Sequence, residues 1–227
     1  MTAPDERAVQ ARAAQRDLVR RGYDRISRAY RNDVGLPHAG TAEHEVQYQE
    51  WTNELAQLLK PGSTVLDLGC GVGIPTSKLL VSKGFKVVGV DISAVQIERA
   101  RLLVPEATFI QADMVSWDAE PETFDAVVSL YALIHVPLED QPRVLGSVRH
   151  WLRRGGYFLA IVGHSRWTGT ENYLGAPMFW DHEDAATYLD WLSHAGLDPL
   201  WHRFVPEGTG GHTLVLAQAG DPSVDRS

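Results

Sequence analysis

The chain of 227 residues has a single cysteine, Cys70, so no disulfide can form within it. The same scarcity excludes a cysteine-rich metal centre and favours a reducing, cytoplasmic location. No run approaches the ~18 consecutive apolar residues of a membrane-spanning helix, and residues 1–16 lack the apolar core of a signal peptide. We therefore expect a cytoplasmic protein that does not enter a membrane.

Positive charge is also in short supply. The sequence has 21 Lys and Arg residues against 29 Asp and Glu residues, which gives a net charge of −8. A protein that binds a phosphate polymer usually carries a basic stripe, so nucleic acid is not expected as a partner. The length fits one domain, because single hydrophobic cores grow to roughly 250–300 residues, and the content of 44% hydrophobic residues is that of a globular protein.

Glycine is concentrated in one stretch, residues 65–75, with the sequence VLDLGCGVGIP. The apolar start predicts a buried strand, which ends in an acid, Asp67, and a tight turn before a helix. Gly69, Gly71 and Gly73 remove three side chains from this turn. The backbone can therefore approach a ligand closely and adopt φ values that other residues avoid. We expect a cofactor to lie on this turn.

The turn differs from the dinucleotide-binding fingerprint. That fingerprint has a third glycine three residues after the second, and Ile74 stands at this position. Asp67 would also repel a pyrophosphate in a cleft without water. A ligand with positive charge at this end fits better, although a nicotinamide oxidoreductase stays open as an alternative.

Four motifs resemble those of the class I S-adenosylmethionine (SAM) dependent methyltransferases. DLGCGVG, residues 67–73, is similar to motif I of that family. VVGVDIS, residues 87–93, resembles its second strand, QADM, residues 111–114, the end of its third, and FDAVVSLYALIHVP, residues 124–137, its fourth strand and the following loop. The resemblance covers roughly residues 64–163.

This resemblance implies SAM as cofactor, and it implies roles for particular residues. Asp91 would hold both ribose hydroxyls, since a carboxylate accepts two hydrogen bonds from a diol and charged acceptors form the stronger bonds. Asp113 would receive the adenine amino group, Met114 would offer its backbone, and Ile92 would form an apolar wall. The full set expected to bind SAM is Tyr30, Asp67, Gly69, Cys70, Gly71, Gly73, Asp91, Ile92, Gln96, Asp113, Met114, Ser129 and Tyr131.

Apolar runs alternate with helical patterns after the glycine turn, which predicts an α/β fold with a parallel sheet and helices on both faces. Ligands bind such sheets at the carboxyl ends of the strands. The expected elements are strands 64–68, 86–90, 107–111, 124–130 and 156–162, helices 73–83, 93–103, 139–153 and 183–194, and a hairpin of 197–205 with 212–217. The resemblance implies a single Rossmann-like doubly wound sheet of seven strands with the last strand antiparallel.

We divide the chain into three parts. Residues 1–60 form an N-terminal helical cap with helices at 3–31 and 42–59, joined by a loop over 31–40, and both helices are expected to cover the cofactor turn. Residues 61–219 form the SAM-binding core. Within the core, residues 164–181 are too long and too aromatic for an idle connection, so they are expected to form a lid or a wall of the acceptor pocket. Residues 220–227 are expected to be disordered.

Methyl transfer from a sulfonium has a neutral leaving group, so it requires positioning and, for a hydroxyl or protonated amine, a base. Three histidines are expected near the active edge: His135 in the loop after the fourth strand, His164 after the fifth strand, and His212 near Glu207. An unperturbed histidine pKa of about 6.5 suits a base at neutral pH. A purely structural role stays open for each of them. Clustered carboxylates are missing, so no metal is expected.

The preferred hypothesis is methyl transfer from SAM to a small-molecule acceptor, with a hydroxyl of a specialised metabolite as the preferred acceptor group. The aromatic lid and the acidic charge favour this reading over a protein or nucleic acid acceptor. N- or C-methylation and a SAM-binding protein without methyl transfer are the alternatives. A monomer or homodimer is expected.

Overall fold

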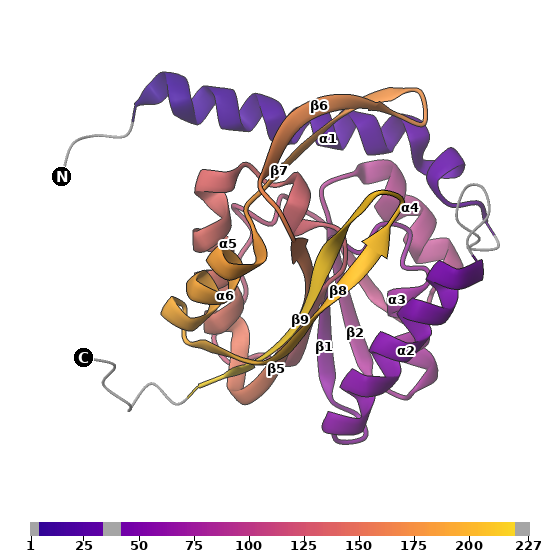
Figure 1. Cartoon of the computed structure of the whole chain (residues 1–227). Coiled ribbons are helices and arrows are strands. Elements are labelled where there is room, and N and C mark those ends of the chain that lie inside the picture. The colour runs from indigo at the N-terminus through magenta and orange to yellow at the C-terminus, as the bar shows by residue number, and fades with distance from the viewer. Residues whose placement is uncertain (1–4, 34–41, 221–227) are drawn as a thin grey trace.

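The computed structural model describes residues 5–33 and 42–220, with the backbone alone over 42–45. Its main sheet has seven strands in the order β3-β2-β1-β4-β5-β9-β8 (Figure 1). β1 to β5 are parallel, and β9 is antiparallel to both neighbours. The predicted Rossmann-like sheet with an antiparallel last strand is thereby confirmed.

The helices and strands follow the predicted alternation. The helices are α1 (Glu6–Tyr30), α2 (Ala42–Leu58), α3 (Thr76–Ser82), α4 (Ala94–Leu103), α5 (Gln141–Trp151) and α6 (Ala185–His194), with a 3-10 turn, η1 (Leu133–His135), after β4. The strands are β1 (Thr64–Leu68), β2 (Lys86–Asp91), β3 (Thr108–Gln111), β4 (Phe124–Ser129), β5 (Leu152–Gly163), β6 (Trp167–Tyr173), β7 (Ala176–His182), β8 (Leu197–Glu207) and β9 (Gly210–Ala219).

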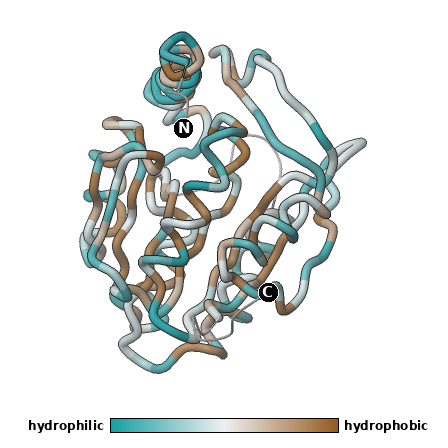
Figure 2. Tube along the Cα trace, turned by 90° about the vertical axis from the view of Figure 1, so that its left-hand side faces the viewer, coloured by the Kyte–Doolittle hydropathy of each residue, from teal (hydrophilic) through white to brown (hydrophobic). Residues whose placement is uncertain are grey.

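Helices cover both faces of the sheet, as parallel strands that are buried on both faces require. On one face α5 and α6 bury Trp151 and Tyr188 against the strands. On the other face α2 and α3 contribute Trp51, Leu55 and Leu80 to a second core. Figure 2 shows the hydrophobic residues concentrated along the strands between these helical layers, with α1 seen end-on above them.

A separate layer lies across the carboxyl edge of the sheet. It consists of α1 and the antiparallel hairpin β6–β7, which lie side by side at the top of Figure 1. Residues 164–181 were expected to form a loop, and the structure shows that most of them pair as this hairpin. α2, the other helix expected to cover the glycine turn, packs with α3 along one face of the sheet.

Two predicted segments fall largely outside the described residues: the loop over 31–40 from residue 34 onward, and the tail from residue 221 onward.

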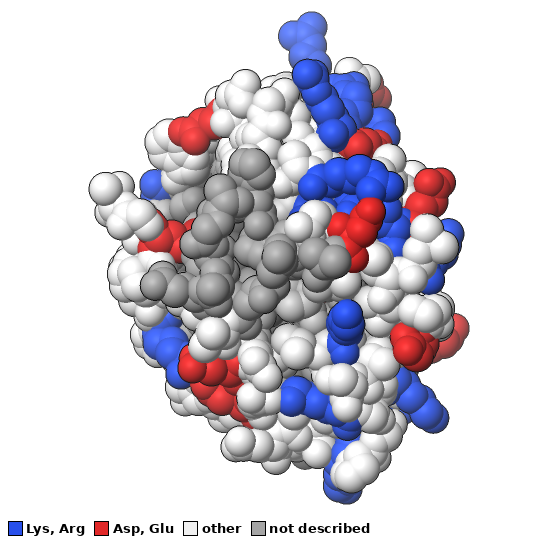
Figure 3. Space-filling view, turned by 90° about the vertical axis from the view of Figure 1, so that its right-hand side faces the viewer, with Lys and Arg blue, Asp and Glu red and all other residues white. Residues whose placement is uncertain are grey.

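In the face that Figure 3 shows, acidic side chains lie beside the basic ones. Within the described ranges, no helix is long and apolar enough to cross a membrane. No group of three or more His, Cys, Asp or Glu residues there could hold a metal ion.

Candidate active site

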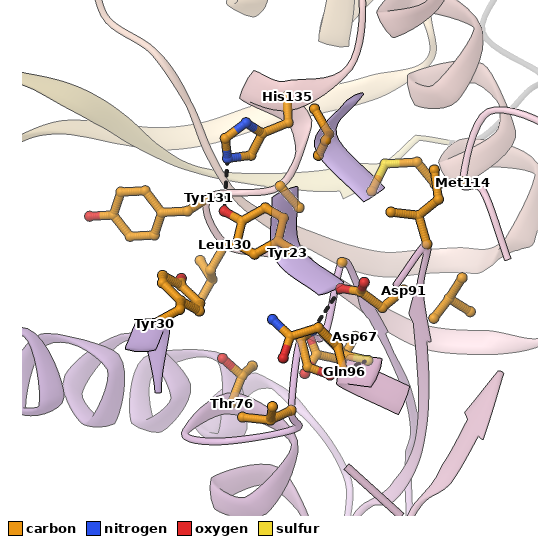
Figure 4. A pocket seen from close by; sticks show the side chains of 18 of the residues that line it. Tyr23, Tyr30, Asp67, Thr76, Asp91, Gln96, Met114, Leu130, Tyr131 and His135 are labelled. Atoms are coloured by element: carbon orange, nitrogen blue, oxygen red, sulfur yellow. Dashed lines mark hydrogen bonds between the residues drawn. The ribbon is translucent and has the colours of Figure 1, made fainter. Parts of the chain in front are cut away.

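A cavity lies between the carboxyl ends of β1, β2 and β4 and the underside of α1 (Figure 4). Its floor is the glycine turn and the acid at the end of β2, and its roof includes Tyr23 and Tyr30 of α1. The predicted residues that line it are Tyr30, Asp67, Gly69, Cys70, Gly71, Asp91, Ile92, Gln96, Asp113, Met114, Tyr131 and His135. Sequence positions more than a hundred residues apart thus surround one space.

The glycine turn is shaped by positive φ angles at all three of its glycines. Gly69 has φ +82°, and a Cβ there would lie 2.1 Å from the Cβ of Ala132, so only glycine fits. Gly71 has φ +54°, and the nearest atom to a Cβ there is Nε2 of Gln96, at 3.8 Å. The backbone at Gly71 is therefore open toward the cavity, as a closely approaching ligand requires.

Asp91 ends β2 and faces the cavity (Figure 4). Its Oδ2 accepts a hydrogen bond from the Gly71 amide at 2.8 Å, and its Oδ1 accepts one from the Ser93 amide at 2.9 Å. Burial raises the pKa of Asp91 to about 6, and these two amides act to lower it. Each carboxylate oxygen has two lone pairs, so both keep capacity for a further donor such as a ribose hydroxyl.

Asp67, at the end of β1, lies beneath the cavity with 2% of its surface exposed. Burial raises its pKa to about 7, although Ser77 Oγ donates to its Oδ2 at 2.6 Å and favours the ionised form. A carboxyl that is costly to ionise gains most from a nearby cation. The chemistry of this donor set therefore fits a ligand with an ammonium group, as SAM has.

Asp113 follows β3 at the opposite end of the cavity, beside Met114. Its Oδ1 accepts from the Val115 amide at 3.0 Å, and its Oδ2 accepts from Nε of Arg16 at 2.7 Å. Arg16 belongs to α1 and also lines the cavity. The carboxylate expected to receive the adenine amino group is thus already bound to the roof.

His135 lies at the end of η1 and is 7% exposed. Its Nδ1 is 2.7 Å from the carbonyl oxygen of Phe179, which can only accept, so Nδ1 carries the proton. Nε2 is therefore the acceptor for the hydroxyl of Tyr23, 3.0 Å away (Figure 4). Burial lowers the pKa of His135 to about 4, so the imidazole is neutral at pH 7 with its Nε2 lone pair directed at a cavity-lining hydroxyl.

Aromatic rings form one wall of the cavity. Tyr30 packs edge-on against Tyr23 at 5.3 Å, and Tyr131 lies 6.1 Å from Tyr48 between ring centroids. Tyr131 has φ +60°, a strained angle for a bulky residue, and such strain clusters at functional sites. Burial raises the pKa of its phenol, and Glu207 raises it further. The phenol therefore stays neutral at physiological pH.

Four predicted site residues do not line the cavity. Ser129 donates its hydroxyl to the Leu68 carbonyl inside the sheet, at 2.9 Å. Gly73 is packed against the ring of Phe109, where a Cβ would be 2.8 Å from Cζ. Both residues lie behind the cavity floor, where they pack at the ends of the strands.

The other two are histidines near the β8–β9 turn. His164 lies 3.1 Å from the Thr213 hydroxyl and packs against the ring of Phe204. His212 pairs with Glu207, with 3.2 Å between Nδ1 and Oε1, and its ring meets the edge of Tyr131. Of the three predicted histidines, only His135 borders the cavity.

Several cavity residues escaped the sequence analysis: Arg16, Val19, Tyr23, Arg31, Tyr48, Thr76 and Leu130. Tyr23 carried a signal, because it stands seven residues before Tyr30. Positions seven apart lie two turns apart on one helix face. Arg16 is one of many arginines of α1, and nothing local distinguishes it.

Comparison with known proteins shows matches in sequence and in structure. Residues 65–156 match the family model described as a methyltransferase domain. The sterol 24-C-methyltransferase of Schizosaccharomyces pombe is 30% identical over 166 residues, which are 69% of this chain and 40% of the relative. The botryococcene C-methyltransferase of Botryococcus braunii is 35% identical over 122 residues, 51% of this chain and 30% of the relative. The chain thus spans well under half the length of these curated relatives.

Solved structures share the fold at low identity. The magnesium protoporphyrin IX methyltransferase of Synechocystis PCC 6803 superposes with a TM-score of 0.70 at 18% identity, over 91% of this chain and all of the other. The [4+2]-cyclase SpnF gives 0.71 at 19%, over 89% and 95%. Residues 65–156 are thus shown to be a methyltransferase domain, and the seven-stranded sheet around it has the fold of the class I SAM-dependent methyltransferases.

Proposed function

We propose that this protein transfers a methyl group from SAM to a small-molecule acceptor and that the acceptor atom is a hydroxyl oxygen. The observation that carries the cofactor assignment is Asp91, which bridges the Gly71 and Ser93 amides and still faces the cavity. Its free lone pairs suit the ribose diol. The glycine turn and Asp67 would hold the methionine part, and Asp113 the adenine.

SAM, when bound, supplies an electrophilic methyl group on a sulfonium. The chain's own contribution is to enclose the acceptor and to receive its proton. Nε2 of His135 is the basic atom at the cavity, and it takes the proton of the acceptor hydroxyl, directly or through the hydroxyl of Tyr23. The sulfur of SAM would leave as a neutral thioether, so the chain would need no acid for the leaving group and only a base for the acceptor proton. Because the histidine pKa is about 4, the base is available at any pH above about 5.

A second candidate is methylation of carbon in an unsaturated apolar acceptor. Two similar proteins support it, because they are named as C-methyltransferases of a sterol and of botryococcene. The aromatic wall formed by Tyr30, Tyr48 and Tyr131 also suits an apolar acceptor. Nε2 of His135 would then remove a proton from carbon instead of oxygen. The protein could also use the site without methyl transfer, and the cyclase among the structural neighbours shows that this fold accommodates other chemistry.

The first experiment is calorimetric titration with SAM and, for comparison, with NADH. Binding of SAM alone supports the cofactor assignment, and binding of NADH alone would replace it with the nicotinamide alternative. A panel of phenols, alcohols, amines and isoprenoid alkenes is then incubated with SAM labelled in the methyl group. The position of the label in the product, read by NMR, separates O- from C-methylation. SAM that is bound without loss of label to any acceptor class favours a site without methyl transfer.

A further inference from the structure

α1 is attached to the rest of the protein by two kinds of contact. Its apolar side, with Val19 and Ile26, packs on Met178 and Phe179 of β7 in a cluster separate from the cores of the sheet. Its contacts with the rim of the cavity are polar. α1 and the hairpin therefore form one packing unit, and polar contacts attach the α1 side of this unit to the cavity rim.

Arg16 makes the polar contacts nearest to the Asp113 end of the cavity. Its Nε donates to Oδ2 of Asp113 at 2.7 Å, and its Nη1 donates to Oδ2 of Asp140 at 2.6 Å. These two acids belong to different parts of the chain: Asp113 lies in the loop after β3, and Asp140 directly precedes α5. The side chains of Arg16 and Asp113 are 19% and 24% exposed, so solvent screens the pair only in part. The fork of the guanidinium matches two acceptors at once, which a lysine cannot do.

The arginine fixes the orientation of Asp113. With Oδ1 bound to the Val115 amide and Oδ2 bound to Nε of Arg16, the carboxylate cannot rotate without breaking a bond. Each oxygen still has a second lone pair that can accept a hydrogen bond, and Asp113 lines the cavity. A carboxylate held in this way is a pure acceptor, so it favours a ring that presents an amino group and disfavours one that presents a keto oxygen.

We infer that Arg16 is a specificity-determining residue of the cofactor site. It orients Asp113 to accept the 6-amino group of an adenine, and it joins the roof helix to the purine end of the cavity. This inference rests on the proposed function, in which SAM occupies the cavity. Its consequence is that selection of the purine and attachment of α1 depend on the same side chain.

The test compares two nucleosides that differ at one position. S-adenosylhomocysteine carries the amino group, and S-inosylhomocysteine carries a keto oxygen in its place. Both are titrated calorimetrically into the wild-type protein and into Arg16→Met, which keeps most of the apolar stem and removes the guanidinium. A hydrogen bond to a charged group contributes about 1.5–3 kcal/mol, so the wild type should prefer the adenosine compound by about ten- to a hundredfold. The variant should bind that compound about tenfold more weakly, with a preference below about threefold.

Arg21→Met is the matched control, because Arg21 lies on the same helix and, among the described residues, its ion pair is with Asp17 of that helix, at 2.5 Å. It should keep both affinities. Arg16→Lys retains a cation without the fork and should lose part of the preference, which provides a second variant if Arg16→Met fails to fold by circular dichroism. Equal weakening of both compounds would show that Arg16 only stabilises the roof, and unchanged affinities would show no role; either result overturns the inference. If the folded wild type binds neither compound, the cofactor assignment itself fails, before any variant is compared.

Discussion

Asp67 should make the ligand-free protein less stable as the pH rises. Its pKa is about 7 in the folded chain against an ordinary value of 3.8, because the carboxyl is buried. A raised pKa means that the folded state favours the protonated form. The stabilisation is fully present below pH 3.8 and is lost as the pH rises through 7. At 1.36 kcal/mol per pKa unit, the loss between these pH values is about 4 kcal/mol.

Asp67→Asn stays neutral at every pH and so removes this loss. Urea unfolding of ligand-free protein, followed by circular dichroism at pH 4.5 and pH 8, should show the variant gaining stability relative to wild type by several kcal/mol at the higher pH. Asp125→Asn is the control of opposite sign. Burial acts to raise the pKa of Asp125, but the hydrogen bonds from Arg153 and the Thr64 amide outweigh it and lower the pKa. That variant should lose stability relative to wild type as the pH rises. An equal change for Asp67→Asn at both pH values would refute the reasoning.

Three further results are expected. Asp91→Ala should weaken SAM binding at least about a hundredfold, since two hydrogen bonds to a charged group are lost, and an unchanged dissociation constant would remove the ribose assignment. His135→Ala should lower turnover of an acceptor found in the screen while SAM affinity measured by calorimetry changes little, and full activity would leave only a structural role. Gly69→Ala should lower the stability in thermal unfolding more than Gly62→Ala does. Both positions have positive φ, which destabilises the fold by about 1 kcal/mol when the residue is not glycine. Only at position 69 would the added Cβ also clash with the Cβ of Ala132, at 2.1 Å. Equal losses would contradict the packing argument.

The sheet could be predicted because its signals are local. β1 and β4 are mostly apolar stretches of five and six residues, and a glycine follows β1 directly. Short apolar runs that end at turn residues are typical of parallel strands buried on both faces. The hairpin β6–β7 could not be predicted in the same way. Its first strand is mostly exposed on both faces, so it shows no alternation, and its second strand is buried by α1, more than a hundred residues earlier in the chain.

The candidate site also has a part that local sequence signals predict, its floor, and a part that they do not predict, its roof. The floor is made by backbone and by side chains at strand ends, such as Gly71 and Asp91, whose spacing along the chain is fixed by the strand–turn–helix unit. The roof depends on contacts between segments far apart in sequence. Tyr23 meets His135 across 112 positions, and Arg16 meets Asp113 across 97. Residue type and spacing along the chain do not predict such pairs, because the pairs form only where α1 packs across the carboxyl edge of the sheet.

The division between floor and roof also bears on specificity. The floor residues are those proposed to hold SAM, and SAM is the same for every acceptor, so these residues would not distinguish one acceptor from another. Tyr23 and Tyr30 come from α1, and the carbonyl of Phe179 that fixes the tautomer of His135 comes from β7. Several of the groups that would meet the acceptor thus belong to the one unit of α1 and the hairpin, or are oriented by it. Acceptor choice can therefore change through this unit, whose apolar cluster is separate from the cores of the sheet, while the cofactor floor stays intact.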